Sequence, residues 1–370
     1  MAIIQRTKLV DVLASMPELE TFRPELINES KSNCLVLAAG FEPRSDWLLD
    51  NSDLNQFDTV VLITYPESNT DFLGKAQDHR NVKTVLFDEK KLDNDLRNLL
   101  GEISGGNDGA INFMLDVSAM SSITIYSAMS ALVDGDFEKD DLSIVYCEAR
   151  SYRPLEEEWK RFLADTAETT DTFEFAEAYC QEHFQTTGVS SVLEFPRFAG
   201  RNEGPSKTKV IAIPNFGLER MKAMLAHCEE LYGAVSSDPY WIFGSPPSSA
   251  NAWRLESLKR LYNSSLDSMN TTASTRNYKE LIRLLDDIYL KDRNVHYVVA
   301  TTGSKMQHIG TYFFLLMRPD VGLMLSRPEK YNVEGYSQEK GPQWHLNFGN
   351  LGEVKARLSK IDKLNFVWEK

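Results

Sequence analysis

The stretch VHYVVATTGSKMQHIG at residues 295–310 decides the fold that the sequence predicts. Its first part, VHYVVAT, is typical of a buried β-strand, and it ends in the small residues TTGS before Lys305. A buried strand that runs into a small-residue turn and then a helix is a common place for an anion or a nucleotide in α/β proteins. A plain strand-to-helix turn is the alternative, and the rest of the chain bears on the choice.

Size and charge limit the classes of protein to consider. The chain has 370 residues, 42% of them hydrophobic, which is enough for two cores. Its net charge of −14 argues against a protein that coats duplex nucleic acid with a broad basic face. The four cysteines form no C-x-x-C pair, and no run approaches the ~18–20 apolar residues of a membrane span. We therefore expect a cytoplasmic protein with no disulfide framework and no membrane partner.

Short apolar segments alternate with helical patterns along the whole chain. Because most of these segments are continuously apolar, they predict strands covered on both faces of a mainly parallel sheet. Strands are expected at 34–40, 59–65, 82–88, 111–117, 142–148, 209–215, 240–246, 295–301 and 321–327, and helices near 45–50, 92–103, 122–133, 218–233, 278–291 and 309–317. Residues 331–350 are expected to be turn-rich, with a helix after them.

The two halves of the chain match in order. Four aligned pairs, Phe41 with Phe216, Pro66 with Pro246, Phe113 with Tyr297 and Tyr152 with Tyr331, are separated by 175 to 184 residues. Near-equal shifts in unchanged order indicate a duplicated unit. The sequence therefore predicts an α/β fold of two tandem Rossmann-like units with mainly parallel sheets flanked by helices: 1–165, a helical connector and linker at 166–205, and 206–370.

Polar residues cluster where the predicted strands end. Ligands of open parallel sheets bind at the carboxyl ends of the strands, where helix N-termini present free N–H groups. Cations there suit a phosphate, and hydroxyls, carboxylates and amides suit a ribose or a base. The candidate ligand-binding residues are Gly40, Glu42, Arg44, Ser45, Thr64, Asp116, Ser118, Ser121, Asn215, Arg220, Ser245, Thr301, Thr302, Gly303, Ser304, Lys305 and Gln307.

Several of these residues have a purely structural alternative. Arg44 can pair with Glu42, and Asp116 with Ser118 can cap the following helix. Thr302 or Ser304 can cap the helix after the last turn. Lys305 has no acidic residue one turn away in the sequence, which favours a ligand.

The common catalytic motifs are absent from the sequence. There is no G-x-S-x-G elbow, and neither G-x-G-x-x-G nor G-x-x-x-x-G-K-[ST] follows the first predicted strand. The histidines show no spacing typical of metal ligands, and His308 alone lies beside the candidate turn. The sequence therefore indicates no cofactor and no metal, and leaves open whether the protein is an enzyme.

The strand followed by TTGSKMQ resembles the strand, small-residue turn and lysine of CRISPR-associated Rossmann-fold (CARF) sensor domains. LDVSAMSS, at residues 115–122, is similar to the D-x-S variants of this turn, although the first half has no lysine there. Two such units in one chain resemble the SAVED sensors of anti-phage systems. The resemblance implies binding of a nucleotide or cyclic oligonucleotide across the two units, with Ser118, Thr302, Ser304 and Lys305 near its phosphates, and a separate effector protein as partner.

Three functions remain open from the sequence. A ligand-binding sensor would bind a phosphorylated ligand without turnover. A phosphodiesterase that opens a cyclic nucleotide would form a product, dependent on Lys305 or Ser118. A protein-interaction scaffold would have no use for the pocket.

Overall fold

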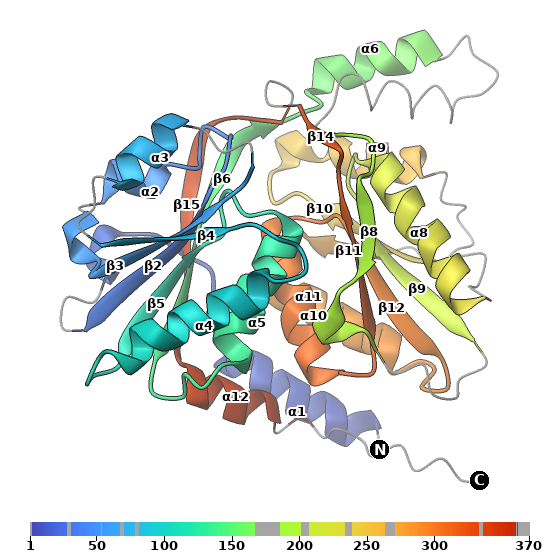
Figure 1. Cartoon of the computed structure of the whole chain (residues 1–370). Coiled ribbons are helices and arrows are strands. Elements are labelled where there is room, and N and C mark those ends of the chain that lie inside the picture. Colours follow the sequence, from blue (N-terminus) through green and yellow to red (C-terminus); the bar gives the residue numbers. More distant parts are fainter. Residues whose placement is uncertain are drawn as a thin grey trace.

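The computed structural model describes residues 2–27, 31–52, 54–66, 70–77, 81–166, 186–200, 207–233, 239–262, 271–332, 336–359 and 361. Most of the predicted connector at 166–205 lies outside these ranges, since they omit residues 167–185 and 201–206. The described chain forms two main sheets that stand side by side, with helices between and around them (Figure 1).

The first sheet has a parallel centre and an antiparallel edge. Its parallel strands are β2 (Ser32–Ala39), β3 (Thr59–Thr64), β4 (Val82–Leu86), β5 (Ile111–Asp116) and β6 (Asp141–Tyr152), in the order β4-β3-β2-β5-β6. The long strand β15 (Ser337–Asn350) pairs antiparallel with β6, and β1 (Glu20–Thr21) pairs antiparallel with β15. The end of the chain thus completes the sheet that its beginning starts.

The second sheet repeats the parallel part of this order. Its parallel strands are β9 (Thr208–Ile213), β10 (Tyr240–Ser245), β11 (Thr271–Ser274), β12 (His296–Thr301) and β13 (Gly322–Arg327), in the order β11-β10-β9-β12-β13. β8 (Ser191–Glu194) adds an antiparallel edge, and β7 (Thr186–Thr187) pairs with β14 (Lys330–Tyr331) in a separate ribbon. In both sheets the five parallel strands, numbered along the chain, lie in the order 3-2-1-4-5, the order of doubly wound α/β folds.

Helices cover both faces of both sheets. The central core packs α4 (Leu92–Gly105), α5 (Ser122–Asp134), α10 (Tyr278–Tyr289) and α11 (Lys305–Met317) between the sheets, with α1 (Ala2–Ser15) and α12 (Leu351–Ser359) at one end (Figure 1). The outer faces carry α2 (Trp47–Asn51) and α3 (Thr70–Gln77) on the first sheet, and α8 (Leu218–Tyr232) and α9 (Trp253–Leu261) on the second, where α6 (Glu156–Thr166) also packs.

The predicted α/β class is confirmed, with mixed, mostly parallel sheets. All nine predicted strands are present, and most of them are apolar runs buried on both faces; the edge strand β4 is the exception, since Lys83, Thr84 and Leu86 are exposed. The expectation of a turn-rich segment at 331–350 is wrong, since most of it is β15. The sheets also cross the predicted boundaries, because β15 lies within 206–370 yet pairs with β6. The division into two domains stays a prediction.

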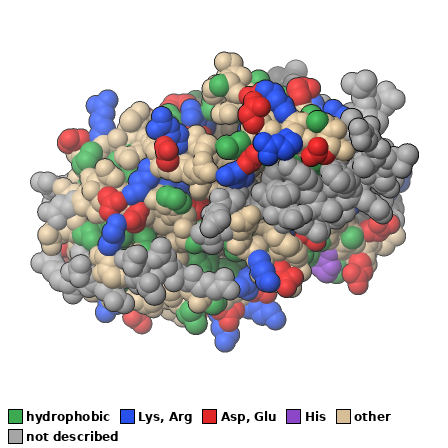
Figure 2. All heavy atoms as spheres, turned by 90° about the horizontal axis from the view of Figure 1, so that it is seen from above, with side chains coloured by type: hydrophobic (Ala, Val, Ile, Leu, Met, Phe, Trp, Pro, Cys, Tyr) green, Lys and Arg blue, Asp and Glu red, His purple; other side chains and the backbone are tan. Residues whose placement is uncertain are grey.

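The surface of the described chain carries both signs of charge. On the face shown in Figure 2, basic and acidic side chains are interspersed. No helix among the described residues has both the length and the apolar character that crossing a bilayer requires.

Leu346 tests whether β15 is integral to the core. Its side chain is fully buried in the central core, so Leu346→Ala should lower the free energy of unfolding by about 2–5 kcal/mol. Leu231 is 47% exposed, and Leu231→Ala is the matched control, with an expected change within about 0.5 kcal/mol. Urea unfolding of both variants measures the difference. Equal effects would contradict the placement of β15.

Candidate functional site

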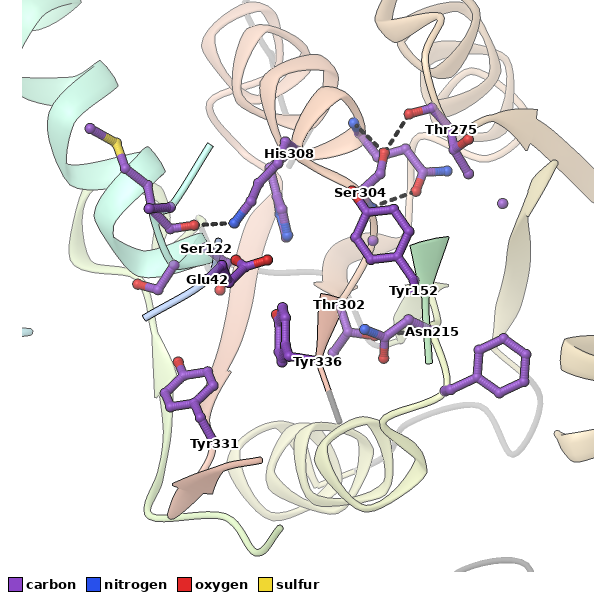
Figure 3. A pocket seen from close by; sticks show the side chains of 18 of the residues that line it. Glu42, Ser122, Tyr152, Asn215, Thr275, Thr302, Ser304, His308, Tyr331 and Tyr336 are labelled. Atoms are coloured by element: carbon purple, nitrogen blue, oxygen red, sulfur yellow. Dashed lines mark hydrogen bonds between the residues drawn. The ribbon is translucent and has the colours of Figure 1, made fainter. Parts of the chain in front are cut away.

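A cavity of about 400 Å³ opens at the carboxyl ends of the strands of both sheets. The loops after β2 and β5 form part of its wall, and those after β9, β10, β12 and β13 face them (Figure 3). Strand ends that are far apart in the chain therefore meet at one place. Eleven of the residues that the sequence singled out line the cavity, namely Gly40, Glu42, Arg44, Ser121, Asn215, Arg220, Thr302, Gly303, Ser304, Lys305 and Gln307.

The other six predicted residues are not part of the wall. Thr301 is fully buried, and its hydroxyl accepts a hydrogen bond from the Gly303 backbone N–H (3.2 Å). Ser45 donates to the Glu42 carbonyl (2.6 Å), and Ser245 pairs with Ser274 in the parallel ladder. These positions alternate with lining residues, because successive side chains of a strand or turn point to different sides. The six are Ser45, Thr64, Asp116, Ser118, Ser245 and Thr301.

Asp116 and Ser118 form a buried turn beside the cavity. Asp116 accepts hydrogen bonds from the Ser118 backbone and hydroxyl, and the Ser118 hydroxyl accepts from Cys147 N (2.8 Å) and Trp47 Nε1 (2.9 Å). The expectation that Asp116 caps the next helix is wrong, since the N-cap of α5 is Ser121, which accepts from Thr124 N. Burial raises the pKa of Asp116 to about 6, against the hydrogen bonds from Ser118.

A buried ion pair stiffens the first-sheet side of the wall. Arg44 donates to both carboxylate oxygens of Glu42, at 2.9 and 3.1 Å, and Ser337 donates to Glu42 Oε2 (2.5 Å). Burial would raise the pKa of Glu42, but the Arg44 charge and these hydrogen bonds hold it below its usual value. Arg44 also donates to the Cys147 carbonyl (3.1 Å) and the Tyr152 hydroxyl (3.0 Å). The structural alternative for Arg44, pairing with Glu42, is therefore confirmed.

Hydrogen bonds of the Thr302 and Ser304 hydroxyls fix the conformation of the turn at 301–307. Ser304 is the N-cap of α11 in a capping box with Gln307, and its hydroxyl donates to the Thr275 carbonyl (2.6 Å). The Thr302 hydroxyl accepts from Asn215 N (3.0 Å). Figure 3 shows Ser304 beside Thr275, and Thr302 beside Asn215. The capping role expected for Ser304 is confirmed.

Lys305 is a cation in an unfavourable place. It is the first residue of α11, where the helix dipole repels positive charge, and its amine donates to the Met120 carbonyl at the start of the α5 turn. Burial, together with the charges of Arg44 and Arg220, lowers the pKa of Lys305 to about 8. The nearby charges of Glu42 and Asp116 act in the opposite direction, but no carboxylate within the described ranges forms an ion pair with it. A bound anion would relieve both penalties.

Other cations of the wall also lack carboxylate partners in the described part of the chain. Arg220 donates to the Ser326 hydroxyl (3.2 Å), and Arg254 donates to backbone carbonyls, including that of Pro154 (2.8 Å). Arg327 places its guanidinium over the Phe87 ring. Arg276 is neutralised by Glu148 (2.6 Å). The cavity of this acidic protein thus carries an excess of positive charge.

Sequence analysis missed the aromatic part of the wall. Phe41 lies 5.2 Å from Tyr331 and 5.5 Å from Tyr336, measured between ring centroids, and the two tyrosines lie 6.1 Å apart. Figure 3 shows both tyrosines on the same side of the cavity as Glu42. Single aromatic residues in loops carry no periodic signal, so only their position after β2 and around β14 could have suggested them.

Acid–base and metal chemistry have few candidates here. His308 lies against Tyr126, and burial together with the charges of Lys305 and Arg220 lowers its pKa to about 3, so its imidazole is neutral at pH 7. No group of three or more His, Cys, Asp or Glu side chains in the described residues is placed to hold a metal ion. The excess of positive charge in the wall suits it to an anion.

Comparison with known proteins finds no match: neither the models of known protein families nor the curated proteins align with this chain. The site is therefore interpreted from its own geometry.

Asp116→Asn tests the raised pKa of this buried carboxyl. Because the folded pKa of about 6 lies above the ordinary value of 3.8, Asp116 stabilises the fold at low pH, and this contribution is lost as pH rises from about 4 to 6. Wild type should lose up to about 3 kcal/mol relative to Asp116→Asn over that range. Urea unfolding at pH 4, 5, 6 and 7 measures it. A difference that does not change with pH would contradict the assignment.

Proposed function

We propose that this chain is a ligand-binding protein of the CARF/SAVED type that binds a nucleotide or cyclic oligonucleotide in its central cavity. The observation that carries the proposal is Lys305, a partly buried cation at a helix N-terminus, in a cavity wall and without an ion-pair partner among the described residues. Such a group is costly in the free protein and favourable with a bound anion.

The fold supports this proposal. Both sheets carry five parallel strands in the same 3-2-1-4-5 order, and in both the helix after the fourth strand, α5 or α11, begins at the cavity. We infer that the two Rossmann-like units are copies of one ancestral unit. In doubly wound folds the ligand lies at the carboxyl ends of the strands, which is where this cavity opens.

The chemistry of the wall suggests how a nucleotide would lie. Its phosphate would contact Lys305 and Arg220, and a base would stack on Phe41, Tyr331 or Tyr336. A volume of about 400 Å³ is within the ~300–1,000 Å³ typical of small-molecule sites.

A thermal-shift screen tests the proposal directly. Mononucleotides, linear dinucleotides and cyclic di- and trinucleotides would each be added to the wild-type protein. A true ligand at a hundredfold excess over its Kd should stabilise the fold by about 2.7 kcal/mol. No shift with any of them would overturn the proposal. Mass spectrometry of the incubated ligand then distinguishes a sensor, which returns it unchanged, from a phosphodiesterase.

Lys305→Ala should weaken binding of such a ligand about 10- to 100-fold, since a hydrogen bond to a charged group contributes about 1.5–3 kcal/mol. Lys355→Ala is the matched control: Lys355 also donates to a backbone carbonyl, that of Gly135 (2.6 Å), but lies outside the cavity wall. Isothermal titration calorimetry measures both. Equal affinities of the two variants would remove Lys305 from the site.

The pH dependence of binding gives a second test. The pKa of Lys305 is about 8 in the free protein, and a bound phosphate would raise it. Affinity should therefore be constant below pH 7 and fall by up to tenfold per pH unit above about 8, as the free amine loses its proton. Lys305→Met should bind weakly and without this dependence. An identical profile in both proteins would assign the titration to another group.

A further inference from the structure

Gln307 presents a hydrogen-bond donor with no partner. Its side chain is 1% exposed and lines the cavity, and its Nε2 makes no hydrogen bond. Its Oε1 accepts the Ser304 backbone N–H (2.9 Å) in the capping box, which fixes the orientation of the amide. A buried, unsatisfied donor costs stability, so its persistence needs an explanation.

Asn215 repeats this arrangement on the same sheet. Its Oδ1 accepts the backbone N–H of Gly217, the N-cap of α8 (2.8 Å), and its Nδ2 has no recorded partner in the described chain. In both side chains the amide oxygen accepts a backbone hydrogen bond at the start of a helix, and the NH₂ group has no recorded partner in the described chain. Both residues line the cavity. This side of the wall therefore offers donors to a ligand.

The neighbouring hydroxyls are already engaged with other groups. The Ser304 hydroxyl accepts from Gln307 N (3.2 Å) and donates to the Thr275 carbonyl, and the Thr302 hydroxyl accepts from Asn215 N and lies against the Ile213 carbonyl (3.4 Å). Gly244 lines the cavity beside the amide: a Cβ atom at that position would lie 2.9 Å from Thr275 Cγ2 and 3.6 Å from Gln307 Nε2. The donor therefore lies close to the cavity wall at a point where residue 244 has no side chain to cover it.

From this geometry we propose that Gln307 selects the base of the ligand, donating from Nε2 to O6 of guanine or O4 of uracil, the positions where adenine and cytosine carry an amine. This inference rests on the proposed nucleotide-binding function. The groups recorded around the amide, Ser304, Thr275 and the two glycines 244 and 303, are uncharged. A neutral donor suits a neutral carbonyl, whereas the phosphates have Lys305 and Arg220 to bind. An exocyclic amine, as in adenine or cytosine, would place donor against donor.

Calorimetry with matched nucleotide pairs tests this selection. The pairs are cyclic di-GMP with cyclic di-AMP, GMP with AMP, and UMP with CMP, which differ in base but not in charge. Wild type should prefer the oxo member of at least one pair by 10-fold or more. Gln307→Glu keeps the acceptor for Ser304 N and replaces the donor with an oxygen, so it should abolish or reverse that preference.

Two controls distinguish a loss of base selection from an effect of the added negative charge and from a loss of folding. Asn251→Asp adds the same negative charge to an exposed residue of the cavity wall and should leave the base preference unchanged. Gln307→Glu retains the capping box but buries a carboxylate, so its urea midpoint shows whether the variant folds. Should it fail to fold, Gln307→Met, which removes the Nε2 donor without adding a charge, takes its place and should lose the same preference.

The experiment distinguishes failure of the proposed nucleotide binding from failure of base selection by Gln307. If wild type binds no nucleotide of the thermal-shift screen, the proposed function fails and this inference fails with it. If it binds another nucleotide of that screen but none of these six, the inference alone fails. If wild type binds nucleotides but favours the amino bases, or if Gln307→Glu weakens every ligand equally, nucleotide binding stands and base selection by Gln307 is overturned. An equal loss would assign the Gln307 donor to a phosphate oxygen instead.

Discussion

The packing of α5 against α11 is the contact on which the rest of the site depends. Each helix follows the fourth parallel strand of its own sheet and therefore begins at that sheet's carboxyl edge. Tyr126 of α5 contacts His308 of α11 (5.6 Å between ring centroids) and Tyr312 (6.3 Å), and Lys305 reaches the Met120 carbonyl across the junction. Because the helix starts are held together, the two carboxyl edges enclose one shared cavity.

The parts of the fold that the sequence predicts are those with an unambiguous physical signal. Strands such as β5 and β12 are mostly apolar and are buried along their whole length, since helices cover both faces of their sheets. β15 was not predicted as a strand because its sequence has no regular pattern. Buried and exposed residues mix along it, and Gly341 and Pro342 interrupt it. Its pairing with β6 also shifts register twice. The four-residue strand β11 is too short and too polar to be recognised.

The site was predictable to a similar degree. The rule that ligands bind at the carboxyl ends of strands located the cavity and eleven of its lining residues. The rule does not say which side chains point into the cavity. Ser118 and Thr301 are therefore among the predicted residues, although both are fully buried outside the cavity wall. Nor could it find Arg254 and Arg276, which follow β10 and β11 and reach across to β6 and its loop. Such contacts between distant segments have no local sequence signal.

The stretch TTGSKMQ at 301–307 can now be explained residue by residue. Thr302 holds the neighbouring loop at Asn215, and Ser304 with Gln307 caps α11. Gly303 is required because a Cβ atom there would lie 2.6 Å from Gln307 Oε1 and displace the amide. Of the side-chain donors in the turn, the Lys305 ammonium has only a carbonyl partner and the Gln307 NH₂ group has none in the described chain. A simple strand-to-helix turn needs neither; under the proposed function, the turn would hold a charged donor and a neutral donor at fixed places before a ligand arrives, which lowers the cost of binding.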